Sequence, residues 1–191
     1  EMCIRDRPVR ACKMKLGAQY GYWTREPKLD IVSVGLEAEN LGYDSLWTGE
    51  SYSSDAFTPL CWVGAHTSKI KLATGIAQLG ARTPATLAMQ AMTLDALSGG
   101  RFCLGIGVSG PQVIEGWHGQ PFGKPIARTK ETINIIRKIL LRDEPVTADG
   151  PNLPLPYPKD APNSWGLGKP LKLINKPVSY THLTLPTKVE V

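Results

Sequence analysis

The sequence predicts an α/β fold, namely the first four strand–helix units of a (β/α)8 barrel. Short apolar runs of extended character alternate along the chain with helical patterns, which is typical of a parallel sheet covered by helices. The four candidate strands begin 31, 25 and 32 residues apart, near Met14, Ser45, Ile70 and Phe102. A repeat of about 30 residues is that of a (β/α)8 barrel, which takes roughly 250 residues to close. In a chain of 191 residues we therefore expect four of the eight units.

The first two units begin with strands that we expect over residues 15–20 and 45–48. Between them a helix is expected over residues 29–41, with one apolar face formed by Leu29, Val32 and Leu36. This helix should end at Gly42, because glycine readily takes the left-handed conformation that closes a helix.

The next two units begin with strands expected over residues 70–76 and 102–106. Thr83 as N-cap and Pro84 at the first helical position predict a helix that ends at Ser98-Gly99-Gly100 and has apolar contacts from Leu87, Ala91, Leu94 and Leu97. A last helix, over residues 126–141, has one apolar stripe made of Ile133, Ile136 and Leu140. Its basic residues lie mostly off that stripe, which is typical of a solvated surface: Arg128, Lys130, Arg137 and Lys138.

The strand–helix pattern covers residues 14–144, and the segments beyond it differ in character. Residues 145–177 hold 8 of the 16 prolines and follow neither a strand nor a helix period, which predicts a long loop. Residues 1–13 and 178–191 contain runs that resemble peptides translated from sequencing-adapter DNA. We therefore expect a non-native leader and tail, and we expect residues 1–7 and 178–191 to pack against nothing.

Composition and charge exclude several classes of protein. Hydrophobic residues make up 42% of the chain, yet we expect neither a transmembrane helix nor a signal peptide, and hence a soluble cytoplasmic protein. Of the net charge of +5, only +2 falls within residues 14–174, without basic and aromatic residues interleaved, which disfavours nucleic acid as a partner. The four cysteines lie far apart and predict neither disulfides nor a metal site: Cys3, Cys12, Cys61 and Cys103.

Residues 105–110 read GIGVSG and match the glycine pattern of dinucleotide-binding proteins. That pattern requires a helix to open at its third glycine and normally lies in the first strand–helix unit. Here it lies in the fourth unit, and prolines and glycines from Pro111 to Pro125 are expected to keep the following segment out of regular helix. We interpret the motif instead as a strand end whose small residues let a flat ligand or a neighbouring strand approach the backbone.

Three longer runs resemble the luciferase-like monooxygenase superfamily. They are residues 74–90 (TGIAQLGARTPATLAMQ), residues 93–107 (TLDALSGGRFCLGIG) and residues 109–125, of which SGPQVIEGWHG and PFGKP resemble the branch that uses coenzyme F420. Members of this superfamily are (β/α)8 barrels that bind a reduced flavin or deazaflavin at the carboxyl end of the strands. The resemblance covers nearly all of residues 14–174 and agrees with the repeat described above.

The resemblance also implies which residues lie near the cofactor. Thr74, Gly75 and Ile76 match a bulge at the end of the third strand, often with a cis non-proline peptide bond, that backs the central ring of the cofactor. Glycine suits such a place, because it accepts unusual backbone angles and removes a side chain from the face of the ring. The further candidates are Glu50 at the end of the second strand, where relatives keep an acidic residue or histidine near the ring, and Gly107, Ser109 and Gly110 after the fourth.

The sequence departs from the sugar-phosphate dehydrogenases of this superfamily at two positions. Where those enzymes have a histidine and a glutamate, this chain has Ser51 and Gly110, so their acid–base pair is absent. His118 is the candidate that could donate a proton in its place, although a lone loop histidine often takes no part in catalysis. Three aromatic residues near strand ends could line an apolar pocket or simply fill the barrel interior: Trp23, Trp47 and Trp117.

The sequence thus predicts an oxidoreductase that transfers a hydride between coenzyme F420 and a small organic substrate, with Glu50 and His118 as the catalytic candidates. An FMN-dependent monooxygenase is the alternative, and a second alternative is that this chain is a non-catalytic fragment, inactive alone. A hydrolase built on Glu50 and His118 would need a nucleophile elbow or a metal set, and neither is present in the sequence. We expect the full-length protein to be a homo-oligomer. We also expect Glu50, Thr74, Gly75 and Gly107 to meet at one edge of the sheet.

Overall fold

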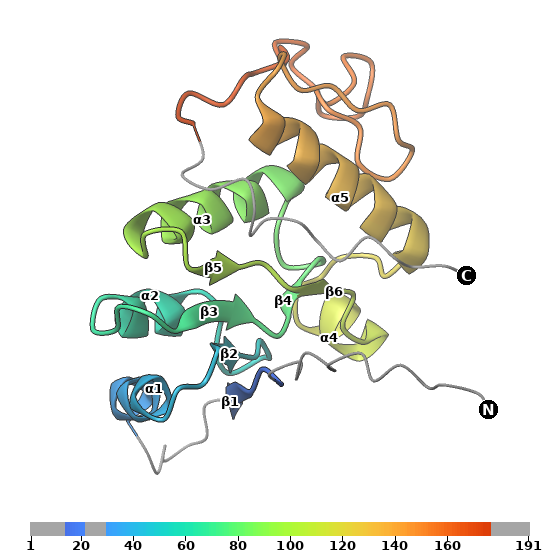
Figure 1. Ribbon diagram of the computed structural model, residues 1–191. Helices are drawn as coiled ribbons and strands as arrows, with labels where there is room; N and C mark the ends of the chain where they lie inside the picture. Colours follow the sequence, from blue (N-terminus) through green and yellow to red (C-terminus); the bar gives the residue numbers. More distant parts are fainter. Residues whose placement is uncertain (1–13, 22–29, 177–191) are drawn as a thin grey trace, which may run out of the picture.

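The structure, a computed structural model, describes residues 14–21 and 30–176 and shows a parallel sheet covered by helices (Figure 1). Four strands pair side by side in the order β1-β2-β3-β5. Their bounds are Gly17–Gly21 for β1, Ser45–Thr48 for β2, Lys71–Thr74 for β3 and Phe102–Cys103 for β5. Because every neighbouring pair is parallel, the carboxyl ends of all four strands lie at one edge. The predicted parallel α/β arrangement is confirmed.

One face of the sheet forms the hydrophobic core. Ala18 pairs with Leu46, Leu46 with Leu72, and Leu72 with Phe102, so these side chains follow one another across the same face. Leu46, Leu72 and Phe102 are completely buried in the cluster that joins the sheet to the helices. This register places the ends of neighbouring strands side by side.

The third and fourth predicted strands are each split in two. A second small sheet pairs β4 (Ala77–Gln78) with β6 (Ile106–Gly107), just beyond the ends of β3 and β5. Between the two sheets the Thr74 hydroxyl donates to the Gly105 carbonyl at 2.7 Å and accepts from the Gly105 N–H at 2.9 Å. A side chain thus takes the place of the regular backbone ladder, and for this reason the predicted continuous strands over 70–76 and 102–106 are wrong in that detail.

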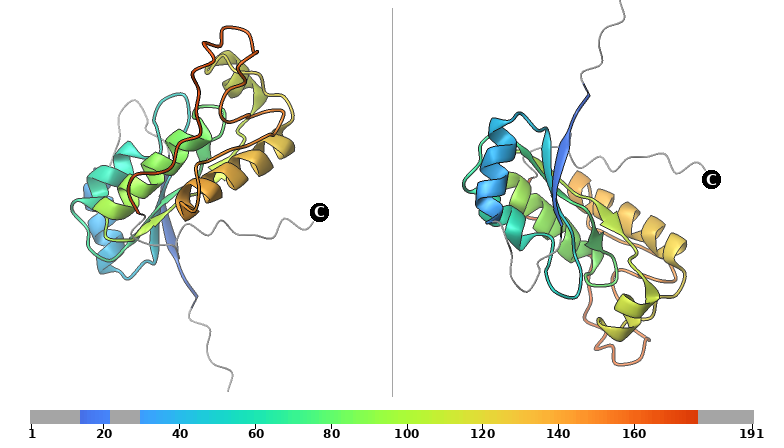
Figure 2. Two further views of the ribbon diagram at one scale, coloured as in Figure 1. Left: turned by 90° about the horizontal axis from the view of Figure 1, so that it is seen from above. Right: turned by 90° about the horizontal axis from the view of Figure 1, so that it is seen from below.

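Among the described residues, five helices accompany these strands: α1 (Ile31–Asn40), α2 (Thr58–Gly64), α3 (Pro84–Leu97), α4 (Pro111–Gly116) and α5 (Pro125–Leu141). Helix α1 contacts α2, α2 contacts α3, and α3 contacts α5. The views of Figure 2 show these four helices as one layer, with α1 and α5 at its two ends. Helix α4 lies instead beside β4 and β6, at the carboxyl edge of the sheet (Figure 1).

The predicted helix ends are confirmed where local signals were strong. Thr83 caps α3, since its side chain accepts from the Thr86 N–H, and Pro84 is the first helical residue. After α3, Gly99 and Gly100 have φ angles of 67° and 83°, and after α1 Gly42 has a φ angle of 77°. These left-handed conformations are the ones that favour glycine.

The buried faces of the helices differ from the prediction. Helix α1 buries Ile31, Gly35 and Ala38, whereas Leu36 is exposed, because Gly35 lets the helix lie close against Val63 of α2. At the end of α3, Leu97 is 74% exposed and does not join the core. In α5 the stripe is centred on Ile135, Ile136, Ile139 and Leu140, with the predicted Ile133 only partly buried.

The segment after the glycine motif also differs from the prediction, because it contains a short helix. Gly110 is the N-cap of α4 and Pro111 its first residue, a position at which proline needs no hydrogen-bonding N–H. Ser109, with a φ of 58°, turns the chain from β6 into this helix. The prediction that this segment stays out of regular helix is therefore wrong for residues 111–116.

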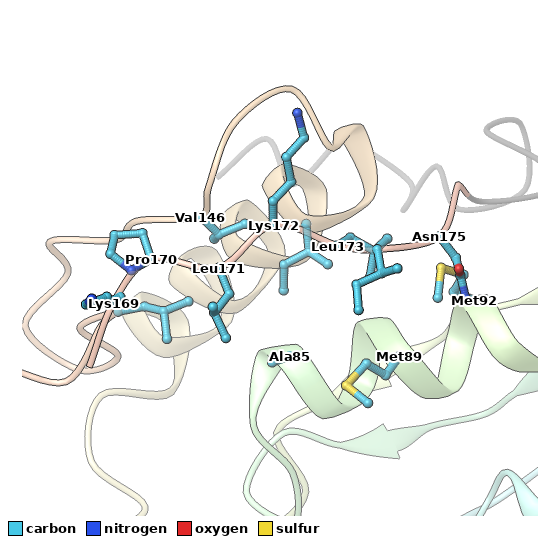
Figure 3. A pocket seen from close by; sticks show the side chains of 13 residues that line it. Ala85, Met89, Met92, Val146, Lys169, Pro170, Leu171, Lys172, Leu173 and Asn175 are labelled. Atoms are coloured by element: carbon cyan, nitrogen blue, oxygen red, sulfur yellow. The ribbon is translucent and has the colours of Figure 1, made fainter. Parts of the chain in front are cut away.

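Residues 142–176 contain no helix or strand element and fold back over α5 and α3 (Figures 1 and 2). Backbone bonds hold this segment: the Val146 N–H donates to Leu171 at 2.9 Å, and Ala148 and Leu155 form an isolated antiparallel bridge. Between it and the outer surface of α3 lies an apolar cavity of about 400 Å³, whose lining includes Met89, Met92, Leu171 and Leu173 (Figure 3). This cavity shares no lining residue with the candidate site described below.

Some expectations fall on residues outside those that the structure describes. These are the leader and tail (1–13 and 178–191), Trp23, Leu29, Cys3, Cys12 and Pro177. Within residues 14–21 and 30–176, no helix is long and apolar enough to cross a membrane. The same residues contain no cluster of three or more metal-ligating side chains, and the two cysteines among them, Cys61 and Cys103, are free thiols.

Candidate functional site

The candidate site is built on the carboxyl edge of the sheet, where β3 gives way to β4 and β5 to β6. Thr74 is fully buried there, and its hydroxyl is used in the two bonds to Gly105. A Cβ at Gly105 would lie 2.1 Å from the Thr74 carbonyl oxygen, closer than any side chain allows. Thr74 therefore shapes this edge from below and does not present its hydroxyl to a ligand.

Gly75 and Ile76 form the partly exposed rim above Thr74. The peptide bond between them is cis, and the Gly75 N–H donates to the Thr48 carbonyl at 2.7 Å. A Cβ at Gly75 would lie 3.1 Å from Cε3 of Trp47, so the space that this glycine leaves is taken by the indole. The indole N–H donates to the Ser45 hydroxyl at 2.8 Å, which fixes the ring. Trp47 thus packs across the sheet beside Gly75.

Gly107, Ser109 and Gly110 continue the rim on the neighbouring strand. The Leu79 N–H donates to the Gly107 carbonyl at 2.9 Å, which ties β6 to the chain after β4. A Cβ at Gly107 would lie 3.0 Å from Cγ1 of Ile76, so the Ile76 side chain lies against this glycine. The structure therefore brings these partly exposed residues and Gly75 to one edge of the sheet.

Glu50 lies at the same edge, buried, in an ion pair with Arg82. The carboxylate accepts from the guanidinium at both oxygens, at 2.5 and 2.6 Å, and Oε2 also accepts the Gln78 N–H at 2.7 Å. Only 5% of the Glu50 side chain and 11% of the Arg82 side chain are exposed. Such a charge-assisted, two-point pair holds both groups in one orientation. Glu50 therefore meets Thr74, Gly75 and Gly107 at one edge, as expected, but with both oxygens engaged.

His118 is joined to Glu50 through Gln78. The Gln78 amide donates to the Glu50 carbonyl oxygen at 3.0 Å, and its Oε1 lies 2.9 Å from Nε2 of His118. Gln78 is only 2% exposed, whereas His118, which follows α4, is partly exposed. The structure thus links the two catalytic candidates through a buried amide.

Arg82 also contacts Phe57, in a loop that Asp55 anchors. Its guanidinium carbon lies 5.2 Å from the centre of the Phe57 ring. Asp55 accepts the N–H groups of Phe57 and Thr58, both at 2.8 Å. Burial raises the pKa of Asp55, but these hydrogen bonds and the nearby Arg82 outweigh it, so the pKa lies below its ordinary value. The loop from Glu50 to Phe57 is thereby anchored around the ion pair.

Gln78 and Arg82, which hold Glu50 and His118 in place, are not among the residues predicted from the sequence. Gln78 follows the apolar strand residue Ala77, and Arg82 directly precedes the N-cap Thr83. A polar residue next to a strand end was the signal that could have drawn attention to Gln78. No local signal pairs Arg82 with Glu50, because the two lie 32 residues apart.

The candidate Trp117 and the second described histidine, His66, lie away from this arrangement or at its margin. Trp117 is exposed and contacts Tyr52, with ring centres 6.4 Å apart. His66 follows α2, and its Nδ1 forms a hydrogen bond with the Trp62 carbonyl at 2.8 Å. Its ring also packs edge-on against the Trp62 indole. It comes before β3 in the chain and thus lies on the amino side of the sheet, away from the rim.

Comparison with known proteins assigns this chain to a family. The profile of the luciferase-like monooxygenases matches residues 13–174. A Mycobacterium tuberculosis protein that carries the name of a coenzyme F420-dependent oxidoreductase is 50% identical over 165 residues, which are 86% of this chain and 47% of that protein. The chain thus spans about half the length of this relative.

Two solved structures resemble this fold, and their names give different cofactors. The coenzyme F420-dependent tetrahydromethanopterin reductase of Methanopyrus kandleri is 25% identical, with a TM-score of 0.61 over 73% of this chain and 44% of that one. The oxygenating constituent of 3,6-diketocamphane monooxygenase from Pseudomonas putida, in complex with FMN, is also 25% identical, with a TM-score of 0.62 over 76% and 44%. These likenesses confirm the predicted fold class, the first units of a (β/α)8 barrel. The chain belongs to the luciferase-like monooxygenase family.

Proposed function

We propose that this chain provides the ring-binding edge of an oxidoreductase that transfers a hydride between coenzyme F420 and a small organic substrate. The observation that carries the proposal is the partly exposed rim of Gly75, Ile76 and Gly107 above a fully buried layer. A flat ring system needs such a surface of backbone and small residues for close approach. The 50% identity to the relative that carries the name of an F420-dependent oxidoreductase supports this cofactor over the alternative.

In this proposal each rim residue has its own place around a flat cofactor. Gly75 and Ile76 would back the ring, while Ser109 and Gly110 would face its edge at the start of α4. Thr74 and Trp47 would support these residues from beneath, since the Thr74 hydroxyl and the indole N–H are both engaged within the protein. When bound, the deazaflavin supplies the carbon that accepts or gives the hydride, and the protein supplies orientation.

Glu50 and His118 take different roles in this proposal. Both Glu50 oxygens are bound by Arg82, so we assign Glu50 to holding the rim in shape and not to moving a proton. His118 is partly exposed and bonded at only one ring nitrogen among the residues that the structure describes. We therefore assign to His118 the exchange of the proton that accompanies the hydride.

A monooxygenase that uses reduced FMN is the second candidate. The likeness to the FMN-bound oxygenating subunit favours it, because that structure matches this chain as closely as the F420-dependent reductase does. Both cofactors present a tricyclic ring, so the same rim would serve either.

Titration of the chain with coenzyme F420 and with FMN, each followed by fluorescence, tests the proposal. We expect F420 to bind more tightly than FMN, and we expect Gly107→Val to weaken that binding at least about tenfold by pushing Ile76 outward. Gly116→Ala is the matched control, since a Cβ there meets nothing within 4 Å. Saturable binding of FMN alone would show that the deazaflavin assignment is wrong. Binding of either cofactor that Gly107→Val leaves unchanged would remove the site from this edge.

A further inference from the structure

The orientation of the Gln78 amide is determined by the chemistry of its neighbours. Its backbone N–H donates to Oε2 of Glu50, and its side chain meets the Glu50 carbonyl oxygen at 3.0 Å. A carbonyl oxygen can only accept, so the amide atom that faces it must be the NH2 group. Oε1 of Gln78 therefore points to His118.

This orientation in turn determines where His118 carries its proton. Oε1 of Gln78 can only accept, so at 2.9 Å the Nε2 atom of His118 must be the donor. In the neutral ring Nδ1 is then the nitrogen with the free lone pair. Among the residues that the structure describes, no hydrogen bond to Nδ1 of His118 is present.

Burial stabilises this orientation of the Gln78 amide against the flipped one. Gln78 is 2% exposed and Glu50 8% exposed, so water cannot readily replace the Glu50 carbonyl as the partner of the amide. If the amide turned over, its oxygen would face the Glu50 carbonyl oxygen and its NH2 group would face the ring. The first of these contacts is repulsive and would leave two buried acceptors without donors.

We propose that Gln78 is a positioning residue that keeps the proton on Nε2 of His118 and thereby makes Nδ1 the atom at which this ring exchanges a proton. The inference rests on the proposed function. When the substrate is reduced, the hydride comes from the reduced cofactor and the proton from Nδ1–H of the cationic ring, which becomes neutral. In the oxidation direction Nδ1 takes up the substrate proton while the hydride passes to the cofactor. Nε2 keeps its hydrogen bond to Gln78 in both directions.

The tautomer can be measured without any cofactor, by nitrogen-15 NMR of the 191-residue chain labelled at its three histidines. His118→Gln assigns the signal. We expect neutral His118 to hold its proton on Nε2 with an excess of about tenfold or more, because one hydrogen bond of about 1.4 kcal/mol corresponds to that ratio. His66 is an internal control with the opposite tautomer, since its Nδ1 faces the Trp62 carbonyl and must carry the proton that it donates.

Gln78→Leu removes the acceptor at nearly constant size and should move the His118 ring toward the tautomer mixture of a free side chain while leaving the His66 signals unchanged. Neutral His118 in the Nδ1–H form in the unmodified chain would overturn the inference, whether or not the variant folds. Retention of the full Nε2–H excess in a folded Gln78→Leu chain would overturn it as well. Binding of FMN without binding of F420 would overturn the proposed cofactor alone, because the tautomer is read in the absence of cofactor.

Discussion

Arg101 joins three segments at the amino edge of the sheet. Its side chain donates five hydrogen bonds at 2.7 to 3.1 Å, to the carbonyl oxygens of Gly64, Thr67, Ile70 and Ser98 and to the Thr67 hydroxyl. These acceptors belong to the end of α2, the start of β3 and the end of α3. The residue lies in one of the runs that carry the family resemblance, yet its contacts are structural and lie at the edge opposite the rim.

Replacing Arg101 by lysine should destabilise the protein by about 2 to 4 kcal/mol, because a single ammonium cannot reach acceptors in several directions and leaves buried carbonyl oxygens without donors. The free energy of unfolding in urea measures this. Arg137→Lys on α5 is the control and should stay within about 0.5 kcal/mol of the parent. A loss of less than about 1 kcal/mol in Arg101→Lys would contradict the role assigned to this side chain.

Helix α1 packs on α2 at a distance that only glycine allows. A Cβ at Gly35 would lie 2.6 Å from Cγ1 of Val63, a fully buried, β-branched side chain with little freedom to move. Leu36, the next residue, is exposed. The helix therefore turns its smallest residue to the interface.

Gly35→Ala tests this packing, because helix propensity and packing predict opposite signs. Alanine in a helix is favoured over glycine by about 1 kcal/mol, whereas the clash with Val63 should cost more and leave a net destabilisation of about 1 to 3 kcal/mol. Thermal unfolding of this variant is compared with that of Gly116→Ala, where a Cβ meets nothing within 4 Å and should be neutral or favourable. Stabilisation of Gly35→Ala would show that the two helices are not held at this distance.

Glu39, near the end of α1, fastens this helix to the start of β3. Its carboxylate accepts the N–H groups of Ser68, Lys69 and Ile70 at 2.6 to 3.1 Å, and the Ser68 hydroxyl at 3.2 Å. Burial raises the pKa of Glu39, but the backbone N–H groups of Ile70, Lys69 and Ser68 outweigh it and hold the pKa below its ordinary value. The carboxylate is therefore the form that the folded protein favours.

This depressed pKa predicts how stability depends on pH. The contribution of Glu39 should be fully present above the ordinary value of 4.5 and should be lost as the pH falls through the lower value of the folded state. The stability difference between the parent and Glu39→Gln should thus be largest at neutral pH and shrink in acid, as urea midpoints at several pH values can show. Glu37→Gln, at an exposed position of the same helix, is the control. A difference that grows in acid would contradict the prediction.

At the scale of the whole molecule, the open sheet leaves surface uncovered. Among the described residues β1 pairs only with β2, and β5 pairs only with β3. Large apolar side chains are exposed on α3 and α5, among them Met89, Leu97 and Ile126. Unpaired strand edges and exposed apolar faces favour association.

We therefore expect the chain by itself to self-associate and to bind either cofactor more weakly than micromolar. Sedimentation velocity at several protein concentrations measures the first property, and the cofactor titration measures the second. The affinity should be low because the rim of Gly75, Ile76 and Gly107 covers only one side of the cofactor ring. A monodisperse monomer with micromolar affinity, about 8 kcal/mol of binding free energy, would contradict both expectations.

Local signals in the sequence determined the strand–helix order and several element ends. Thr83 with Pro84 and the glycines after α3 mark the bounds of that helix, because capping and left-handed turns depend on residues adjacent in the chain. The predicted bounds of strand β2, residues 45–48, agree with the structure at both ends. The resemblance to the family placed Gly75, Ile76 and Gly107 at the carboxyl edge, although their roles there stay predictions.

Only the tertiary structure decided how that edge is held together. The break in the strands depends on Thr74 meeting Gly105, 31 residues away, and the buried face of α1 depends on how closely Val63 approaches. In the same way Glu50 is bound by Arg82 and linked through Gln78 to His118, a contact across 40 residues. Periodicity in the sequence shows that a residue lies on a face, but which partner meets that face depends on distances set by the packing of the whole sheet. For this reason the sequence identified Glu50 and His118 as candidates, and the structure alone joined them.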